Sequence, residues 1–466
     1  MLNPRGDSLF GTVRMKNLAI IVLAAGKGTR MKSELPKVLH RVAGRSLLGH
    51  VLHSARALNP VRAVIVTGPD MENVAAAARA VFPKAECAVQ IDRLGTAHAV
   101  SVAREALSGF NGTVLILYGD VPLISEAALS ALTGLVGPQT AMAVLGFEAA
   151  DPHGYGRLIR NAAGAVAAIR EELDATPQER SITLCNSGVI AISSELLWEL
   201  LPKVGNTNAK GEYYLPDLVE LAAAEGHPCG LATCSESGVA GVNDRVQLAA
   251  VEATLQAAYR RQHMLNGATL VAPVTVFFSA DTIIGRDVVI EPNVVFGPGV
   301  SVGDNVEILA FSHLEGATIG SGARIGPYAR LRPGAEIGED AHIGNFVEVK
   351  KAIIGKGAKA NHLTYIGDAR IGAKTNIGAG TITCNYDGYE KHLTDIGENV
   401  FVGSNTALIA PVKIGDGASI AAGSVITRDI PADALAISRA DLDMRPGWAA
   451  RYRQIKAARK AAKRKG

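Results

Sequence analysis

The C-terminal half of the chain repeats with a period of six residues, and this repeat restricts the possible folds more than any other feature. A period of six matches neither the 3.6-residue period of an α-helix nor the two-residue alternation of an ordinary strand. It predicts a solenoid with flat faces of about six residues each, with the recurring aliphatic side chain inside. Aliphatic or aromatic residues recur at Ile284, Ile290, Phe296, Val302 and Ile308, at Ile319, Ile325, Leu331, Ile337, Ile343 and Val349, and at Ile396, Val402, Leu408, Ile414, Ile420 and Ile426.

Glycine usually follows the aliphatic position of the repeat, and a small or aliphatic residue often occupies the fourth position after it. A narrow interior agrees with a composition rich in Gly (50 of 466 residues) and poor in aromatics (5%). The repeat slips in phase between its runs, which indicates loops that leave the coil, the largest at 383–395. We expect positive φ at the coil corners, which glycine tolerates, for Gly285, Gly320, Gly326, Gly338, Gly344, Gly397 and Gly415.

The N-terminal half alternates short apolar runs with amphipathic stretches of helical period. This alternation is typical of an α/β, Rossmann-like fold, in which helices cover both faces of a mostly parallel sheet. Such folds bind ligands in the loops at the carboxyl ends of the strands. We expect strands at 18–23, 63–66 and 113–117, and helices at 47–58, 71–81 and 96–107.

The chain is too long for one ordinary core, so two or three domains are expected. A stretch without Pro or Gly at 245–263 predicts a long helix between the two patterns. The predicted order is a flexible extension at 1–16, an α/β domain at 17–244, a linker helix at 245–264, an all-β hexad domain at 265–440 and a basic tail at 441–466.

Positive charge is concentrated at the C-terminus. The last 16 residues hold eight Lys and Arg and no acid, which leaves 39 basic and 44 acidic residues in the rest. A basic body for nucleic-acid binding is therefore not supported, and no nucleic-acid partner is expected. The tail could contact RNA or anionic lipid, but we expect a solvated, disordered end.

The sequence favours a cytoplasmic protein. Its five cysteines form no CxxC pair, so neither a disulfide framework nor a zinc site is expected. No apolar stretch is long enough for a membrane span, and residues 1–16 lack the apolar core of a signal peptide.

A glycine-rich segment, Leu23–Lys37, directly follows the first predicted strand. Its glycines allow backbone N–H groups to approach a phosphate, and Lys27, Arg30 and Lys37 add positive charge. The spacing fits neither the P-loop nor the GxGxxG pattern, so an ATPase and a Rossmann dehydrogenase are not indicated. From the residues alone, an ordinary strand-to-helix turn and a loop-capping role for Asp120 remain the alternatives.

This segment resembles the signature of the sugar-nucleotide pyrophosphorylase family, G-x-G-T-R-M followed by P-K. The same family has counterparts of four further segments here: Tyr118-Gly-Asp120-Val-Pro, Gly154-Tyr-Gly156-Arg, Gly241-Val-Asn243, and Gln90 with Gly95-Thr96. The likeness to its bifunctional members covers roughly 17–440, hexads included. It implies a left-handed parallel β-helix of hexapeptide repeats after the nucleotidyltransferase domain.

The resemblance implies roles for residues of the first half. Asp120 and Asn243 would hold Mg²⁺, while Arg30 and Lys37 would stabilise charge during uridylyl transfer from UTP. An extra residue upstream leaves Glu171 or Glu172 open as the sugar-binding carboxylate, with Glu171 preferred. The uridine and the acetamido sugar would be bound by Leu23, Ala24, Ala25, Gly26, Lys37, Gln90, Gly95, Thr96, Tyr118, Gly119, Asp120, Gly156, Glu171, Asn186 and Asn243.

Polar residues interrupt the hexads at 345–351, 360–368 and 376–388. A lone histidine is usually structural, but His362 lies among Lys, Tyr and Asn, and these segments resemble the acetyltransferase site of the same bifunctional proteins. The resemblance implies that His362 is a general base, and nothing calls for Cys384 as a nucleophile. Glucosamine-1-phosphate and acetyl-CoA would be bound by Arg332, Lys350, Tyr365, Asn376, Asn385, Ala379, Tyr386, Ser404, Ala422 and Arg439.

The resemblance therefore implies a homotrimeric enzyme that acetylates glucosamine-1-phosphate and then uridylylates the product, supplying UDP-N-acetylglucosamine for peptidoglycan and lipopolysaccharide. One alternative is a pyrophosphorylase that uses its solenoid only for assembly. The cluster around His362 counts against it. A second is a non-catalytic protein like the translation-factor exchange subunits, against which the intact Gly26, Lys37 and Asp120 count.

Overall fold

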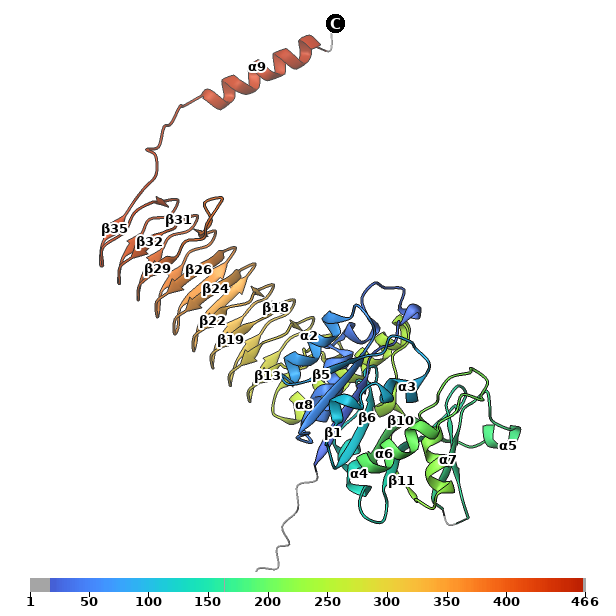
Figure 1. Cartoon of the computed structure of the whole chain (residues 1–466). Helices are drawn as coiled ribbons and strands as arrows, with labels where there is room; N and C mark the ends of the chain where they lie inside the picture. Colours follow the sequence, from blue (N-terminus) through green and yellow to red (C-terminus); the bar gives the residue numbers. More distant parts are fainter. Residues whose placement is uncertain (1–16, 163, 464–466) are drawn as a thin grey trace, which may run out of the picture. The chain divides into compact units, whose positions relative to one another are not determined.

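The computed structural model describes residues 17–162 and 164–463. The extension predicted at 1–16 lies outside the described residues. The chain divides into two compact units, with the boundary between Tyr259 and Arg260 (Figure 1). Each unit is built around its own β structure.

The first unit contains a nine-stranded sheet in the order β5-β4-β1-β6-β10-β7-β11-β9-β8. Strands β5, β4, β1 and β6 are parallel, and β10 runs antiparallel to both β6 and β7. The strands are β1 (Leu18–Leu23), β4 (Arg62–Thr67), β5 (Glu86–Val89), β6 (Thr113–Tyr118), β7 (Met142–Glu148), β8 (Arg157–Arg160), β9 (Val166–Arg170), β10 (Leu184–Ser193) and β11 (Cys229–Cys234), with a separate hairpin of β2 (Arg41–Val42) and β3 (Arg45–Ser46).

Helices cover both faces of this sheet, as predicted. Alternate residues of β1 enter opposite cores: Ile20 and Val22 pack with α1, α2 and α4, whereas Ala19 and Ile21 pack with α3, α6 and α7. This is why the apolar run of β1 is continuous rather than alternating. The helices are α1 (Leu47–Arg56), α2 (Glu72–Val81), α3 (Thr96–Ser101), α4 (Glu126–Leu135), α5 (Pro177–Arg180), α6 (Ser194–Leu200), α7 (Asp217–Ala224) and α8 (Arg245–Leu265).

The predicted strands and helices of this unit are confirmed, with two helices shorter than expected: the helix expected at 47–58 ends at Arg56. The helix expected at 96–107 ends at Ser101, and a 3-10 turn, η3 (Glu105–Leu107), follows it. The long helix expected at 245–263 is α8.

The second unit is a parallel β-helix, as the hexads predict, and its coils have three faces. Face one contains β12 (Thr269–Leu270), β14 (Val289–Ile290), β17 (Glu307–Ile308), β20 (Arg324–Ile325), β23 (His342–Asn345), β25 (Lys359–His362), β27 (Asn376–Ile377), β30 (Phe401–Val402), β33 (Ser419–Ile420) and β35 (Leu435–Ala436). Face two contains β15 (Val295–Phe296), β18 (His313–Leu314), β21 (Arg330–Leu331), the first parts of β24 (Glu348–Ile354) and β26 (Tyr365–Ile371), β28 (Ile382–Cys384), β31 (Ala407–Ile409) and β34 (Val425–Ile426). Face three contains β13 (Ile283–Ile284), β16 (Ser301–Val302), β19 (Ala317–Ile319), β22 (Ala335–Ile337), the second parts of β24 and β26, β29 (Thr394–Ile396) and β32 (Val412–Ile414).

The recurring aliphatic residues fill the coil interior. Ile290, Ile308, Ile325 and Ile343 form one buried column, and each is 0% exposed. Burying each such side chain stabilises the fold by about 1.5–3 kcal/mol relative to its exposure. The loop expected at 383–395 leaves the coil between β28 and β29, with Tyr386 bridged to Lys391.

The reason predicted for the corner glycines is mostly wrong. Of the seven named glycines only Gly326 has positive φ, at 96°. The others lie where the next coil approaches closely: a Cβ on Gly338 would lie 2.7 Å from the carbonyl oxygen of Ile354. Positive φ falls on other corner residues, including Phe311, Tyr328 and Phe346.

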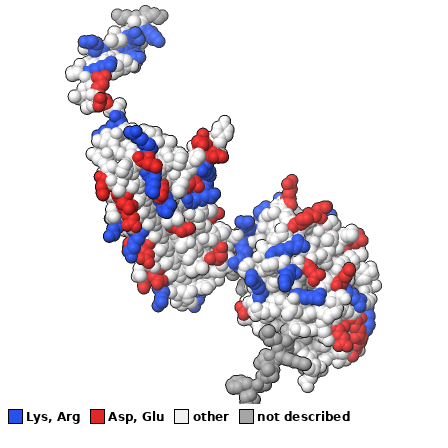
Figure 2. All heavy atoms as spheres, turned by 60° about the vertical axis from the view of Figure 1, so that its left-hand side comes forward, with Lys and Arg blue, Asp and Glu red and all other residues white. Residues whose placement is uncertain are grey.

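The disorder expected for the last 16 residues, 451–466, is wrong for those of them that the structure describes. Residues Trp448–Lys463 form α9, because they are mostly Ala, Lys, Arg and Gln, which favour helices. All its residues are exposed, so the expectation of a solvated tail holds. Lys and Arg are the only charged residues of this helix and form blue patches on it (Figure 2). Among the described helices, none combines the length and apolar character that crossing a bilayer requires.

Candidate active sites

A pocket of about 350 Å³ opens at the carboxyl ends of β1, β5 and β6. Strand β1 has β4 on one side and β6 on the other, so the chain leaves it at a topological switch point, where α/β sheets bind ligands. The pocket is lined by Leu23, Ala24, Ala25, Gly26, Lys37, Val38, Gln90, Arg93, Gly95, Thr96, Ala99, Tyr118, Asp120 and Glu212.

The glycine-rich loop forms one wall of this pocket. A Cβ on Gly26 would meet no heavy atom within 4 Å, so this glycine borders open space that a ligand could occupy. Gly28 has φ +60°, and a Cβ there would lie 2.5 Å from the Cβ of Lys37. The loop therefore turns back onto η2 (Lys37–Leu39). The amide of Gly119 donates to the carbonyl of Leu23 at 3.0 Å and joins the ends of β1 and β6.

Two oxygen ligands meet two cations beside the loop. The ammonium of Lys37 donates to Asp120 Oδ2 and, at 3.2 Å, to Asn243 Oδ1. Arg30 Nη2 donates to the same Asn243 oxygen at 3.0 Å. A carboxylate and an amide oxygen converging on one cation form the oxygen-rich donor set that Mg²⁺ prefers. The structure thus brings together the two predicted metal ligands and the two predicted phosphate-binding cations.

The residues predicted to bind uridine follow β5, which is separated from β1 by β4 in the sheet. Gln90 Nε2 donates to the carbonyl of Gly95 at 3.2 Å. Gly95 has φ +121°, and a Cβ there would lie 2.4 Å from the carbonyl oxygen of Tyr213. Thr96 Oγ1 accepts from the amide of Leu215 at 2.9 Å. Only glycine fits at 95, because the backbone of Tyr213 occupies the space that a Cβ would need.

The predicted sugar residues lie around Tyr118. Burial, together with the negative charge of Glu171, raises the pKa of the Tyr118 hydroxyl. A Cβ on Gly156 would lie 3.0 Å from Glu171 Oε1, and the carbonyl of Gly156 accepts from the amide of Asn186 at 2.8 Å. Gly188, with φ +86°, lies against the ring of Tyr118.

The two adjacent carboxylates differ in their surroundings. Burial raises the pKa of Glu171, which faces Gly156 and Tyr118. Glu172 forms an ion pair with Arg157 at 2.7 Å, and that hydrogen bond lowers its pKa. Glu172 is therefore already paired with Arg157, which supports Glu171 as the carboxylate available to a sugar.

Sequence reasoning missed Arg93 and Glu212, which also line the pocket. Arg93 Nε donates to the carbonyl of Ala25 at 2.9 Å, so a further cation is attached to the glycine-rich loop. Its place between Gln90 and Gly95 in the sequence was a usable signal, because that short loop was already expected to bind uridine.

In the second unit, His362 lies where face one turns into face two. Its Nδ1 hydrogen-bonds Asn345 Oδ1 at 2.7 Å, and these two residues are paired on adjacent coils. The role of Asn345 was not predicted. A coil of about 17 residues would have indicated it, because 345 and 362 differ by that number.

The predicted acetyl-CoA residues follow the same corner along the coils. The strand register places Ala379, Ser404 and Ala422 successively after His362. Arg439 Nη1 donates to the carbonyl of Ala422 at 2.8 Å. These small residues leave a continuous edge at which a long, thin ligand could lie.

The predicted phosphate-binding residues lie on face two and at its far end. Arg332 pairs with Glu348 at 2.7 Å, and the ammonium of Lys391 lowers the pKa of Lys350. Asn385 Nδ2 donates to Asp368 Oδ2 at 2.5 Å.

Three predicted residues are placed apart from these contacts. Tyr365 lies over Gly367 on face two, and the Tyr386 hydroxyl donates to the carbonyl of Gly388 in the protruding loop. Asn376 lies on face one. Among the described residues, no hydrogen bond or ion pair joins His362 to the cations of face two.

Comparisons with known proteins match both units. The MobA-like NTP transferase domain family matches residues 20–209. The family of six bacterial transferase hexapeptide repeats matches 281–316, 316–351 and 394–428. Curated relatives named Bifunctional protein GlmU are similar over nearly their whole length: that of Paramagnetospirillum magneticum is 56% identical (96% of this chain, 99% of the relative). Those of Azorhizobium caulinodans and Rhodospirillum rubrum are 55% and 57% identical, each covering 94% of this chain and 98% of the relative.

Proposed function

The chain belongs to the family of bifunctional GlmU proteins, and from this premise we propose how its two units divide the chemistry. It is a bifunctional enzyme of UDP-N-acetylglucosamine synthesis. It transfers acetyl from acetyl-CoA to glucosamine-1-phosphate, and then UMP from UTP to N-acetylglucosamine-1-phosphate with release of pyrophosphate. The single observation that carries our assignment of sites is the convergence of Lys37, Asp120 and Asn243 in the pocket after β1.

We assign uridylyl transfer to the first unit. The sugar phosphate attacks the α-phosphorus of UTP in line, and pyrophosphate leaves, so no covalent nucleophile is needed. Arg30 and Lys37 stabilise the negative charge that spreads over the transferring phosphate. The uridine is bound by Gln90, Gly95 and Thr96 with the loop 23–26, and the acetamido sugar by the residues around Tyr118 and Glu171.

The uridylyl transfer depends on Mg²⁺. Asp120 and Asn243 would hold the ion, because their oxygens already share one cationic partner, the Lys37 ammonium. Mg²⁺ is usually held by one or two protein oxygens together with substrate phosphates and water. When bound, it supplies charge neutralisation between the two phosphate groups.

We assign acetyl transfer to the left-handed parallel β-helix of the second unit. Because the amide oxygen of Asn345 can only accept, the hydrogen on the imidazole resides on Nδ1 of His362. Nε2 is then left with a free lone pair, which can take a proton from the sugar amine as it attacks the thioester. Arg332 and Lys350 bind the sugar phosphate, with Tyr365, Asn376 and Asn385 orienting the sugar. Acetyl-CoA lies along the corner that carries Ala379, Ser404 and Ala422, towards Tyr386 and Arg439.

We further propose a homotrimer working in the cytoplasm. Support comes from Phe311, Tyr328 and Phe346, whose rings stack at 5.0 and 5.1 Å along the corner that leads to His362. These residues are 50%, 46% and 55% exposed. All three also have positive φ, which bulky residues rarely adopt. A neighbouring copy that covers them would explain both features. Free cysteines agree with a reducing compartment.

The experiment incubates the purified chain with glucosamine-1-phosphate, acetyl-CoA, UTP and Mg²⁺ and follows free thiol and pyrophosphate separately. Both products are expected. Pyrophosphate should disappear without acetyl-CoA and return when N-acetylglucosamine-1-phosphate is supplied. Pyrophosphate without any thiol would remove the assignment of His362.

A further inference from the structure

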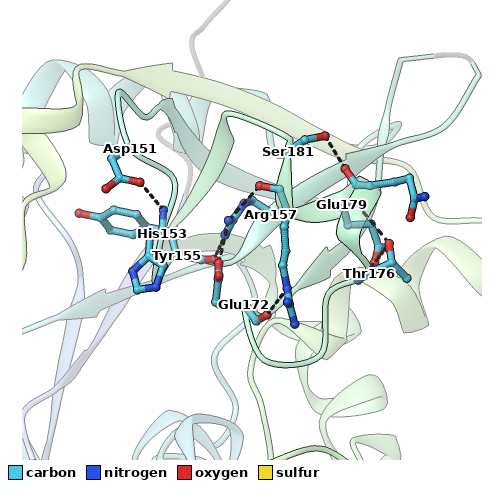
Figure 3. A network of polar contacts seen from close by, with 10 residues as sticks. Asp151, His153, Tyr155, Arg157, Glu172, Thr176, Glu179 and Ser181 are labelled. Carbon is cyan, nitrogen blue, oxygen red and sulfur yellow. Dashed lines mark hydrogen bonds and ion pairs between the residues drawn. The ribbon is translucent and has the colours of Figure 1, made fainter.

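Arg157 has no assigned role in either reaction, yet its charged side chain is buried. It is 1% exposed and is among the largest fully buried side chains of the described chain. It lies at the start of β8, beside the predicted sugar site, in the polar network of Figure 3.

The guanidinium of Arg157 ties three separate segments together. Its Nη2 pairs with Glu172 Oε2 at 2.7 Å and donates to the carbonyl of Arg180 at 3.2 Å, while Nη1 donates to the carbonyl of Tyr155. Arg180 Nε in turn donates to the carbonyl of Glu172 at 3.3 Å. The segment after β9 is thereby held against β8 and against α5 (Figure 3).

Both members of the ion pair directly adjoin a predicted sugar-binding residue. Arg157 follows Gly156 in the chain, and Glu172 follows Glu171. The space above Gly156 is bordered by Glu171 Oε1, 3.0 Å from where a Cβ would lie. A shift of either segment by a fraction of an ångström would therefore change the distance between these two walls of the subsite.

Stability alone explains this ion pair poorly. Arg157 is buried and the Glu172 side chain is 23% exposed, and an ion pair with a buried member can often be replaced by apolar residues of similar volume without loss of stability. Here, moreover, Nε of Arg157 is buried with no hydrogen-bond partner among the described residues, which is an energetic cost. A costly pair beside a binding site indicates a geometric role.

We propose that Arg157 and Glu172 are a positioning pair for uridylyl transfer. Their contact fixes the spacing between Gly156 and Glu171, and it engages Glu172 so that Glu171 is the carboxylate presented to the acetamido sugar. The inference rests on the proposed sugar site. Neither residue touches substrate, so the effect of changing them should be confined to the sugar and should spare the nucleotide.

The test compares Glu172→Gln, Arg157→Lys, and the apolar double variant Arg157→Met with Glu172→Leu. Steady-state kinetics give the KM for N-acetylglucosamine-1-phosphate and for UTP separately, and thermal unfolding gives the Tm. The matched control is Glu225→Gln, which removes an ion pair of the same 2.7 Å length, with Lys203, in the same unit. Acetyl transfer by the second unit, which carries none of these changes, checks that any loss is confined to uridylyl transfer.

We expect the KM for the sugar phosphate to rise by about 10- to 100-fold in the double variant, with the KM for UTP and the Tm near those of the parent. Arg157→Lys, which keeps the charge, should be milder. A double variant with an unchanged sugar KM, or one that raises both KM values equally, would overturn the proposal. Glu171→Gln distinguishes failure of the positioning proposal from failure of the sugar site on which it rests. If Glu171→Gln also leaves the KM for the sugar phosphate unchanged, the sugar site itself is misassigned.

Discussion

Lys37 and Asp120 are 83 positions apart in the chain, yet the ammonium of the one contacts Oδ2 of the other where β1 and β6 end side by side. The same carboxylate oxygen is the proposed ligand of Mg²⁺. In the structure, Lys37 thus occupies part of the place that the ion and the phosphates would share during the reaction.

Asp120→Ala should therefore abolish uridylyl transfer, by at least about 10²–10³-fold in kcat, because both the metal ligand and the partner of Lys37 are lost. Acetyl transfer should be unchanged, since His362 lies in the other compact unit. Pyrophosphate release and thiol release, measured on the same sample, check this. Equal losses in both reactions would contradict separate sites.

Asn345→Ala should lower acetyl transfer by about 10–100-fold, because the hydrogen bond that fixes the His362 tautomer is removed. The KM for acetyl-CoA should change little. Thr375→Ala, which also removes a polar contact between coils, with Gly397, is a suitable control away from His362. An Asn345 variant that transfers acetyl at the parental rate would show that the contact is only structural.

The pH dependence of acetyl transfer should reflect the paired lysines. The ammonium of Lys391 lowers the pKa of Lys350, so Lys350 loses its proton at a lower pH than an ordinary lysine does. Because phosphate binding needs the protonated form, the KM for glucosamine-1-phosphate should rise as the pH increases towards that lowered pKa. In Lys391→Gln the rise should move to higher pH. Profiles of KM between pH 7 and 10 test this, and coincident profiles would contradict it.

Arg93→Met should raise the KM for UTP by about tenfold, because the carbonyl of Ala25 loses a charged hydrogen-bond donor and the loop loses its anchor. The KM for N-acetylglucosamine-1-phosphate should stay near the parental value. Arg62→Met is the control, since Arg62 also donates to a backbone carbonyl, that of Ala106, outside the pocket. A rise in both KM values would indicate general loosening of the unit.

Much of the fold could be predicted because its signals are local and repeated. The continuous apolar run at 18–23 and the six-residue period of the hexads are both readable from neighbouring residues, and the structure reproduces both. The helix of the tail was missed, although its Ala, Lys and Arg content favours one, because charge density alone was taken as a sign of disorder.

The parts that could not be predicted depend on contacts between distant segments. Pattern reasoning places a residue such as Arg157 at the surface, and only the fold shows it buried against Glu172. Likewise, the clash that requires glycine at 338 comes from the next coil, 16 residues later at Ile354. The recurrence of glycine after the aliphatic position was visible in the sequence, but its physical reason, the approach of the next coil, was not.

The central claim is that one chain carries two independent sites, and mixing two defective proteins tests it most directly. Neither Asp120→Ala nor His362→Ala should convert glucosamine-1-phosphate, acetyl-CoA and UTP to UDP-N-acetylglucosamine alone. Together they should do so, because the acetylated intermediate can leave the first protein and enter the second. Failure of the mixture, with each protein still performing its remaining half-reaction, would show that the two sites must act within one molecule.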